Sequence, residues 1–347
     1  MIRAALLAPF RTASARGNAV TVDRVMRGLR GRGVDLHVSD LSTLPAEAVT
    51  REVQAYRPGL IHAFHARRTG PLALGLARRL EVPLVVTLTG TDANHDLVDP
   101  EHAPIVRGVL EGAEVITAFH TSIVERVVDV IPACGPRCVV VPQSVDLPLT
   151  ASFDLAARWA LPPDRLLFLM PAGIRPVKGP RVPLAPLDAL AAADPRVRLA
   201  YVGSVLDAGE GVALERELAR RPWARYLGAV PHAEMASLLG QADVVLNSSV
   251  SEGGMANSLL EALAMRRAVL ASDIAGNRAL IEHDVTGLLF RDAADLRRQA
   301  ARLAGDPTLR ERLGALGQAL VQREFPLERE ALGYWNVYRQ LARVTSR

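Results

Sequence analysis

Residues 244–290 read VVLNSSVSEGGMANSLLEALAMRRAVLASDIAGNRALIEHDVTGLLF, and this stretch decides the fold. The apolar run at 244–248 predicts a strand, a glycine-containing loop follows it, and a helix is expected to start near Ala256. Further apolar runs at 268–272 and 286–290 predict the next strands. Short apolar strands that alternate with helices are typical of a parallel sheet covered on both faces, so the stretch indicates an α/β fold.

The same alternation extends outward from this stretch. Residues 147–163 interrupt it with Pro148, Pro162 and Pro163 and predict a linker, so we expect Rossmann-like domains at 1–148 and 164–325. Strands are expected at 3–9, 34–39, 60–65, 84–89, 114–119, 139–142, 166–170, 198–202 and 226–229, with helices such as 19–32 and 71–80 between them.

The tail from residue 292 onward is expected to be helical, with breaks near 306–307 and 325–326. An apolar stripe at helical spacing needs a surface to cover, so we expect the last helix, 327–347, to cross back and pack on the first domain. The stripe consists of Leu332, Trp335, Tyr338 and Leu341.

The composition of the chain limits which classes of protein it can belong to. With 347 residues and 49% hydrophobic content the chain can bury two cores. No signal peptide and no apolar run long enough to span a membrane is visible, and the two cysteines, Cys134 and Cys138, lack the neighbours of a zinc site. These features predict a cytoplasmic protein with free or weakly paired thiols and no bound metal.

The formal charge is +4, and Lys178 is the single lysine among 41 Lys and Arg residues. Helix 19–32 is basic, which favours a solvated face and leaves contact with an anionic membrane as the alternative. No aromatic residues lie between these charges, so nucleic-acid binding is not expected. The basic residues of the helix are Arg24, Arg27, Arg30 and Arg32.

Two loops after predicted strands contain residues suited to a phosphate ligand. In 10–18, Gly17 precedes a helix N-terminus and can let backbone N–H groups approach a phosphate, although an ordinary strand–helix turn fits equally well. In 172–179, Arg175 and Lys178 offer a planar fork and a point charge, which together can neutralise a diphosphate. Ligands of such sheets bind at the carboxyl ends of strands, where both loops are expected.

The third loop lies in 247–264. Asn257 and Ser258 fall in the first turn of the expected helix, whose free N–H groups can hold phosphate oxygens. About one turn further, Glu261 can accept hydrogen bonds from ribose hydroxyls, while a capping or surface role is the plainer interpretation. Glu252 in the loop can accept hydrogen bonds from sugar hydroxyls in the same way.

These motifs resemble retaining GT-B glycosyltransferases of family 4, and within them the glycosyltransferase 1 domain-containing group. The resemblance includes 244–290 and continues in order through GNAVTVDRV, LTGTDAN, VPQSVD, AGIRPVKG and YVGSVLD, so it spans nearly the whole chain. It implies two facing Rossmann-like domains, a C-terminal crossover helix, and a nucleotide-diphosphate sugar as donor, with a UDP-sugar favoured. GNAVTVDR, HARR and LTGTD are also similar to selenosugar synthases.

The resemblance also implies roles for single residues. Glu261 would bind the ribose, Glu252 the donor sugar, Arg175 and Lys178 the diphosphate, and the Gly17 backbone a phosphate. The remaining residues implied at the donor site are Asn18, Gly173, Val230 (near the base), Gly253, Gly254, Met255, Ala256, Asn257, Ser258 and Leu259.

The sequence departs from the family pattern twice. The family has seven residues between its two glutamates, whereas eight separate Glu252 from Glu261 and Gly253 takes the regular position. A one-residue bulge would restore Glu252. Many relatives have a histidine where this chain has Thr89, which makes Asp92 a candidate catalytic residue beside Arg175, Lys178 and Glu252.

Acceptor binding is expected near the ends of two strands of the first domain. His62 and His65 alternate at the end of 60–65, where one buried and one surface histidine is the plainer interpretation. Arginines after them can hold an anionic group. The acceptor-side candidates are His65, Arg67, Thr89, Gly90 and His120.

Together these residues predict a metal-independent transferase without a cofactor, in which positive groups stabilise the leaving diphosphate. A sugar-nucleotide epimerase and a selenosugar synthase remain alternatives with the same fold. An exported two-domain solute-binding protein is disfavoured.

Overall fold

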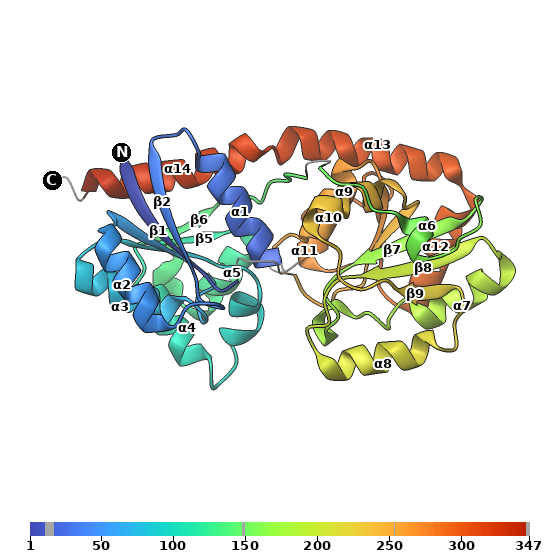
Figure 1. Ribbon diagram of the computed structural model, residues 1–347, viewed down its shortest axis with the longest axis horizontal. Coiled ribbons are helices and arrows are strands. Elements are labelled where there is room, and N and C mark those ends of the chain that lie inside the picture. Colours follow the sequence, from blue (N-terminus) through green and yellow to red (C-terminus); the bar gives the residue numbers. More distant parts are fainter. Residues whose placement is uncertain (11–16, 148–149, 253, 345–347) are drawn as a thin grey trace. The chain divides into compact units, whose positions relative to one another are not determined.

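Each half of the chain builds a six-stranded sheet in which all neighbouring strands are parallel (Figure 1). The computed structural model describes residues 1–10, 17–147, 150–252 and 254–344. The first unit comprises 1–144, 252–254 and 326–347, and the second unit comprises 145–251 and 255–325.

The sheet of the first unit has the order β2-β1-β3-β4-β5-β6. Its elements are β1 (Ile2–Ala8), α1 (Gly17–Leu29), β2 (Val34–Asp40), α2 (Ala46–Tyr56), β3 (Leu60–Phe64), α3 (Gly70–Leu80), β4 (Leu84–Thr87), the π-helical turn η1 (Asp92–Asp96), α4 (Ala103–Glu111), β5 (Val115–Ala118), α5 (Thr121–Val130), the 3₁₀ segment η2 (Pro132–Arg137), β6 (Cys138–Val140) and the C-terminal α14 (Leu327–Val344).

The sheet of the second unit has the order β12-β11-β10-β7-β8-β9. Its elements are α6 (Leu155–Arg158), β7 (Leu166–Pro171), the 3₁₀ turn η3 (Pro176–Lys178), α7 (Leu184–Ala193), β8 (Val197–Val202), α8 (Ala208–Leu218), β9 (Ala224–Tyr226), α9 (His232–Gly240), β10 (Val244–Asn247), α10 (Asn257–Ala264), β11 (Ala268–Ser272), α11 (Ala275–Arg278), β12 (Leu288–Phe290), α12 (Ala293–Gly305) and α13 (Pro307–Glu324).

The strand order gives each sheet one point at which the direction of winding reverses. In the first unit this point lies between β1 and β3, and in the second unit it lies between β7 and β10. Loops that leave neighbouring strands in opposite directions open a crevice at the carboxyl ends of the strands, where doubly wound sheets bind ligands. The two loops of the second unit that start at this point are the predicted segments 172–179 and 247–264.

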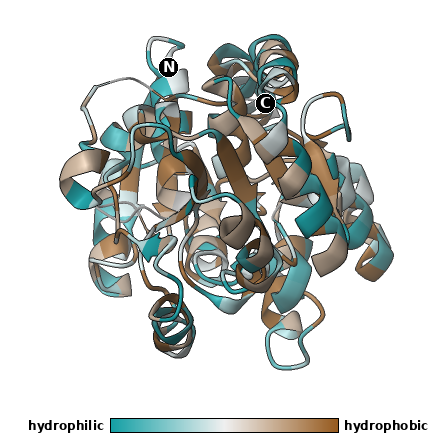
Figure 2. Ribbon diagram, turned by 90° about the vertical axis from the view of Figure 1, so that its right-hand side faces the viewer, coloured by the Kyte–Doolittle hydropathy of each residue, from teal (hydrophilic) through white to brown (hydrophobic). Residues whose placement is uncertain are grey.

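Burial explains why the central strands are apolar throughout. Every residue of β3 and of β10 is buried, because helices cover both faces of each sheet. Figure 2 shows hydrophobic residues concentrated on the strands, while hydrophilic residues recur along the helices. The prediction of an α/β fold with parallel sheets is confirmed.

Helix α14 packs against α1 within the first unit. Arg24 of α1 is buried and donates from Nε to Glu330 Oε2 at 2.6 Å and from Nη2 to Oε1 at 3.0 Å. Ser144 donates its backbone N–H and its hydroxyl to the same carboxylate. The prediction that Arg24 lies on an exposed basic face is therefore wrong, because a carboxylate on the last helix neutralises it inside the unit.

Segment 147–163, expected to be a linker, differs from that expectation. It contains the single-turn helix α6 and groups with the second unit. Phe153 and Trp159 are buried, and the backbone N–H of Phe153 donates to Ser237 Oγ at 3.0 Å. The second unit therefore starts before the predicted boundary at residue 164.

Candidate functional site

The loops that follow β7 and β10 are joined by hydrogen bonds at the reversal point of the second unit. Ser248 Oγ donates to the carbonyl oxygen of Gly179 at 2.8 Å, and Val250 N–H donates to the carbonyl oxygen of Val177 at 2.9 Å. These bonds place the loop that contains Arg175 and Lys178 beside the loop that leads to α10. Both basic side chains are half-buried.

The close approach of these loops depends on glycine. Gly179 has a φ of +56°, and a Cβ at this position would lie 2.5 Å from the carbonyl oxygen of Ser248. Gly173 has a different constraint, since a Cβ there would lie 2.6 Å from Leu206 Cδ1 in the loop after β8. The backbone at Gly179 therefore leaves no room for a side chain against Ser248, whereas a side chain at Gly173 would have to displace that of Leu206.

A buried polar network beneath the β10 loop fixes its path. Asn247 Oδ1 accepts from the Ser249 N–H at 3.0 Å, and Ser272 Oγ donates to the Ser249 carbonyl oxygen at 2.5 Å. Asn277, which is fully buried, donates from Nδ2 to the Ser272 carbonyl oxygen at 2.9 Å. The loop that leads toward Glu252 thus starts from a rigid base.

Helix α10 begins at Asn257 directly after this loop. Its N-cap is Ala256, in extended conformation, and alanine has no side-chain acceptor for the first N–H groups of the helix. Positive partial charge at this helix end can therefore be directed to an anion. Met255, Ala256 and Leu259 have buried side chains, so any ligand contact from these predicted residues would come from the backbone.

Glu261 lies on α10 one turn beyond its start and is 9% exposed. Its Oε1 lies 2.8 Å from Nε2 of His232, the first residue of α9. Val230, two residues before His232, is buried, so it can present only its backbone to a base. Sequence reasoning placed Glu261 at the site and missed its partner, because the two residues are far apart in the chain.

In the first unit, Asp92 organises the loops after β3 and β4. The carboxylate is fully buried; Oδ1 accepts the backbone N–H groups of Thr89, Gly90 and Ala93, and Oδ2 accepts that of Ala66 at 2.9 Å. Both carboxylate oxygens are committed to the backbone in this conformation. This geometry favours a positioning role for Asp92 over direct contact with the reacting atoms.

His65 follows β3 with a φ of +84°, which is rare for a residue other than glycine. Its Nε2 lies 3.0 Å from Thr91 Oγ1, and burial lowers its pKa, with Asp92 acting in the opposite direction. Next to it, Asp96 lies 2.8 Å from Nε of Arg67 and 3.3 Å from Nδ1 of His102. Backbone strain is therefore found at His65 and an ion pair at Arg67, two of the predicted acceptor-side residues.

The other two histidines of this region have different surroundings. His62 is fully buried with its ring nitrogens 2.6 Å from the hydroxyls of Tyr338 and Thr87, and burial lowers its pKa to about 3. It links α14 to the sheet. His120 caps α5, where its Nδ1 accepts the N–H of Ser122 at 3.2 Å, and burial lowers its pKa as well.

Comparison with known proteins identifies the family. Residues 165–306 match the model described as "Glycosyl transferases group 1". The chain is 30% identical over 310 residues to a D-inositol 3-phosphate glycosyltransferase of Segniliparus rotundus, covering 84% of this chain and 68% of that protein. The chain belongs to the group 1 glycosyl transferases. It is accordingly an enzyme of the hexosyltransferase type.

Two other proteins that are similar to this chain agree with its membership of the family. A glycosyltransferase 1 domain-containing protein 1 of Xenopus tropicalis is 27% identical over 305 residues, which is 86% of each chain. The crystal structure of Anabaena HepE in complex with UDP-glucose superposes with a TM-score of 0.79 at 17% identity and covers each chain completely. The fold of the group 1 glycosyltransferase is GT-B, as expected.

Some predicted residues of the group 1 glycosyltransferase cannot be placed. Gly253 lies outside the described residues, so the bulge that would restore Glu252 is not tested, and Gly17 and Asn18 are described only as the backbone start of α1. Gly254 has a φ of +117°.

Among the described residues, Cys134 and Cys138 are free, and no group of three His, Cys, Asp or Glu side chains is arranged to hold a metal ion. None of the described helices is long and apolar enough to cross a membrane.

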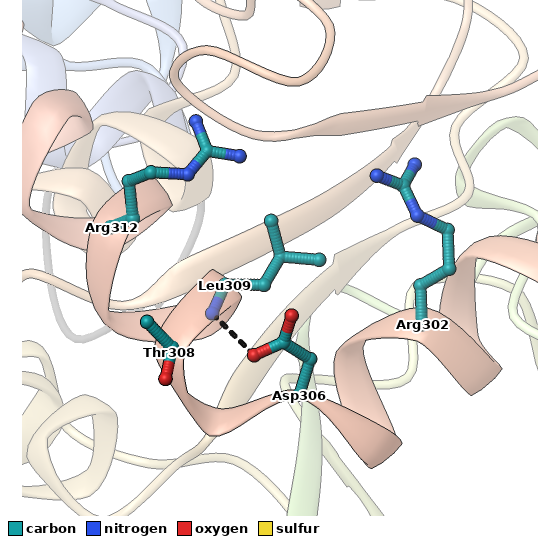
Figure 3. Close-up of a pocket in the computed structure, with 5 residues that line it drawn as sticks. All are labelled: Arg302, Asp306, Thr308, Leu309 and Arg312. Atoms are coloured by element: carbon teal, nitrogen blue, oxygen red, sulfur yellow. Dashed lines mark hydrogen bonds between the residues drawn. The ribbon is translucent and has the colours of Figure 1, made fainter.

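A surface pocket of the group 1 glycosyltransferase lies at the junction of α12 and α13 (Figure 3). Arg302 in this pocket is already paired with Asp284, its Nη2 donating to Oδ1 at 2.6 Å, and Asp306 caps α13 by accepting the Leu309 N–H at 2.8 Å. The pocket contains none of the loop residues at the strand ends and is not the candidate site. Its lining residues are Arg302, Asp306, Thr308, Leu309 and Arg312.

Proposed function

We propose that this enzyme transfers a sugar from a nucleotide-diphosphate sugar to an acceptor, and that its second unit binds the donor. The observation that carries the proposal is the pair of hydrogen bonds, Ser248 Oγ to Gly179 and Val250 N–H to Val177, at the reversal point of the sheet. They hold the loop that carries two basic side chains beside the loop that leads to the N-terminus of α10. That combination suits a diphosphate.

Charge development explains the proposed catalysis. When the glycosidic bond breaks, the leaving diphosphate gains negative charge, which Arg175, Lys178 and the N–H groups at the start of α10 would stabilise. Glu261 would hold the ribose and Glu252 the donor sugar, while the backbone at Gly17 would approach a phosphate. These positive groups can neutralise the diphosphate without a divalent metal, and retention of configuration is proposed from the family resemblance.

The acceptor is proposed to bind at the strand ends of the first unit. His65, Arg67 and His120 are grouped there with the Thr89–Gly90 backbone, whose N–H groups Asp92 holds in place. A UDP-sugar is the favoured donor. Anabaena HepE, whose solved structure contains UDP-glucose, supports this choice because its whole length superposes on this chain.

A binding screen followed by a turnover assay tests the proposal. Thermal unfolding is measured with UDP-, GDP- and ADP-sugars, because a ligand at 100 times its dissociation constant stabilises the folded state by about 2.7 kcal/mol. Stabilisation by one sugar nucleotide, but not by the free sugar, is the expected result. Release of the nucleoside diphosphate should then require an acceptor and continue in EDTA. Stabilisation by none of the nucleotides would refute the proposal.

A further inference from the structure

The hydrogen bond between His232 and Glu261 joins two helices of the second unit. Nε2 of His232 lies 2.8 Å from Oε1 of Glu261, and the two side chains are 28% and 12% exposed. The pair thus lies at the edge of the packed interior, within reach of a ligand from solvent. An ionised carboxylate only accepts hydrogen bonds, so Nε2 carries the proton, either as the neutral Nε2–H tautomer or as the imidazolium.

This contact uses one carboxylate oxygen and leaves the other for a ligand. Among the described residues, none donates a hydrogen bond to Oε2 of Glu261. A donor on one oxygen restricts rotation of the carboxylate, so the second oxygen presents its lone pairs in a fixed direction. Hydroxyl groups on a ligand need such an acceptor in a defined place.

We propose that His232 is a positioning residue that orients Glu261 toward the ribose hydroxyls of the bound nucleotide. This inference rests on the proposed function, in which Glu261 contacts the ribose. Because His232 would act through Glu261, its removal should weaken only the part of nucleotide affinity that comes from the 2′- and 3′-hydroxyls. The contacts to the diphosphate and the base should be unchanged.

Isothermal titration calorimetry with UDP and 2′,3′-dideoxy-UDP tests this expectation. Wild-type protein should bind UDP about tenfold more tightly than the dideoxy form, which is the size of one hydrogen bond to a charged group. His232→Ala should weaken UDP binding about tenfold and dideoxy-UDP binding by less than about twofold. His232→Gln, whose amide can also donate, should recover UDP binding to within about threefold.

Glu234→Ala on the same helix is the matched control, because Glu234 is half-buried on α9 and its carboxylate has no hydrogen bond or ion pair to the described residues. It should bind both nucleotides as wild type does. If His232→Ala weakens both nucleotides equally, or still prefers UDP tenfold, the inference is overturned while the proposed function stands. If wild-type protein binds neither UDP, GDP nor ADP, the proposed function itself fails.

Discussion

Replacement of Glu330 by alanine tests how α14 is attached to the first unit. Glu330 is 1% exposed and Arg24 is 2% exposed. The substitution removes two hydrogen bonds from Arg24 and two from Ser144, and it leaves a guanidinium buried without its carboxylate. Loss of one partner of a buried ion pair costs about 3–5 kcal/mol.

Differential scanning calorimetry measures the effect. At roughly 2–4 °C per kcal/mol for a unit of this size, Glu330→Ala should lower the melting temperature of the first unit by about 6–20 °C. The double variant Arg24→Met with Glu330→Leu should recover most of the loss, because it leaves no unpaired charge. A melting temperature of Glu330→Ala within about 2 °C of wild type would refute the reasoning.

Three further substitutions test the site and the buried histidine. Lys178→Ala should lower the transfer rate about tenfold or more without changing the melting temperature, as steady-state kinetics and thermal unfolding would show; wild-type turnover would remove Lys178 from the site. Gly179→Ala should weaken nucleotide binding and stability, because the φ of Gly179 is +56° and a Cβ there would lie 2.5 Å from the Ser248 carbonyl oxygen. Gly75→Ala on α3, where a Cβ meets nothing within 4 Å, should weaken neither binding nor stability, and equal behaviour of the two variants would contradict the prediction. Burial lowers the pKa of His62 from 6.5 to about 3, so the unfolded state takes up a proton first as the pH falls. In urea titrations, the unfolding free energy of wild type should therefore fall by about 2 kcal/mol more between pH 7 and pH 5 than that of His62→Gln, and equal losses would show that His62 does not titrate in this way.

The sequence predicts most strands because apolar runs bounded by turn residues are a local signal. β1, β2, β7, β8, β10 and β11 lie within about one residue of the predicted ranges. The strand predicted at 226–229 is Ala224–Tyr226 instead. Arg225 interrupts the apolar pattern of this edge strand, and Gly228, with a φ of +85°, follows in the loop.

The predicted loops could be named from the sequence, but their mutual arrangement could not. Ser248 meets Gly179 from 69 positions away, and Arg24 meets Glu330 from 306 positions away. Such contacts depend on the strand order, which no local pattern encodes. The same limit explains why Arg24 was placed on an exposed face.

The residues that hold the candidate site in place could not be predicted from the sequence either. Asn277 and Ser272 belong to a later strand and helix than the loop that they hold, and serines and asparagines are common in any loop. His232 was expected only as part of a helix start. Polar residues that act through tertiary hydrogen bonds have no spacing of their own to recognise.

A crystal structure of the protein with UDP-glucose, or with whichever sugar nucleotide raises its melting temperature most, tests the central claim most directly. The account predicts the diphosphate within about 3 Å of the charged groups of Arg175 and Lys178, with the ribose hydroxyls on Glu261. A nucleotide bound elsewhere, with both basic side chains turned to solvent, would contradict it.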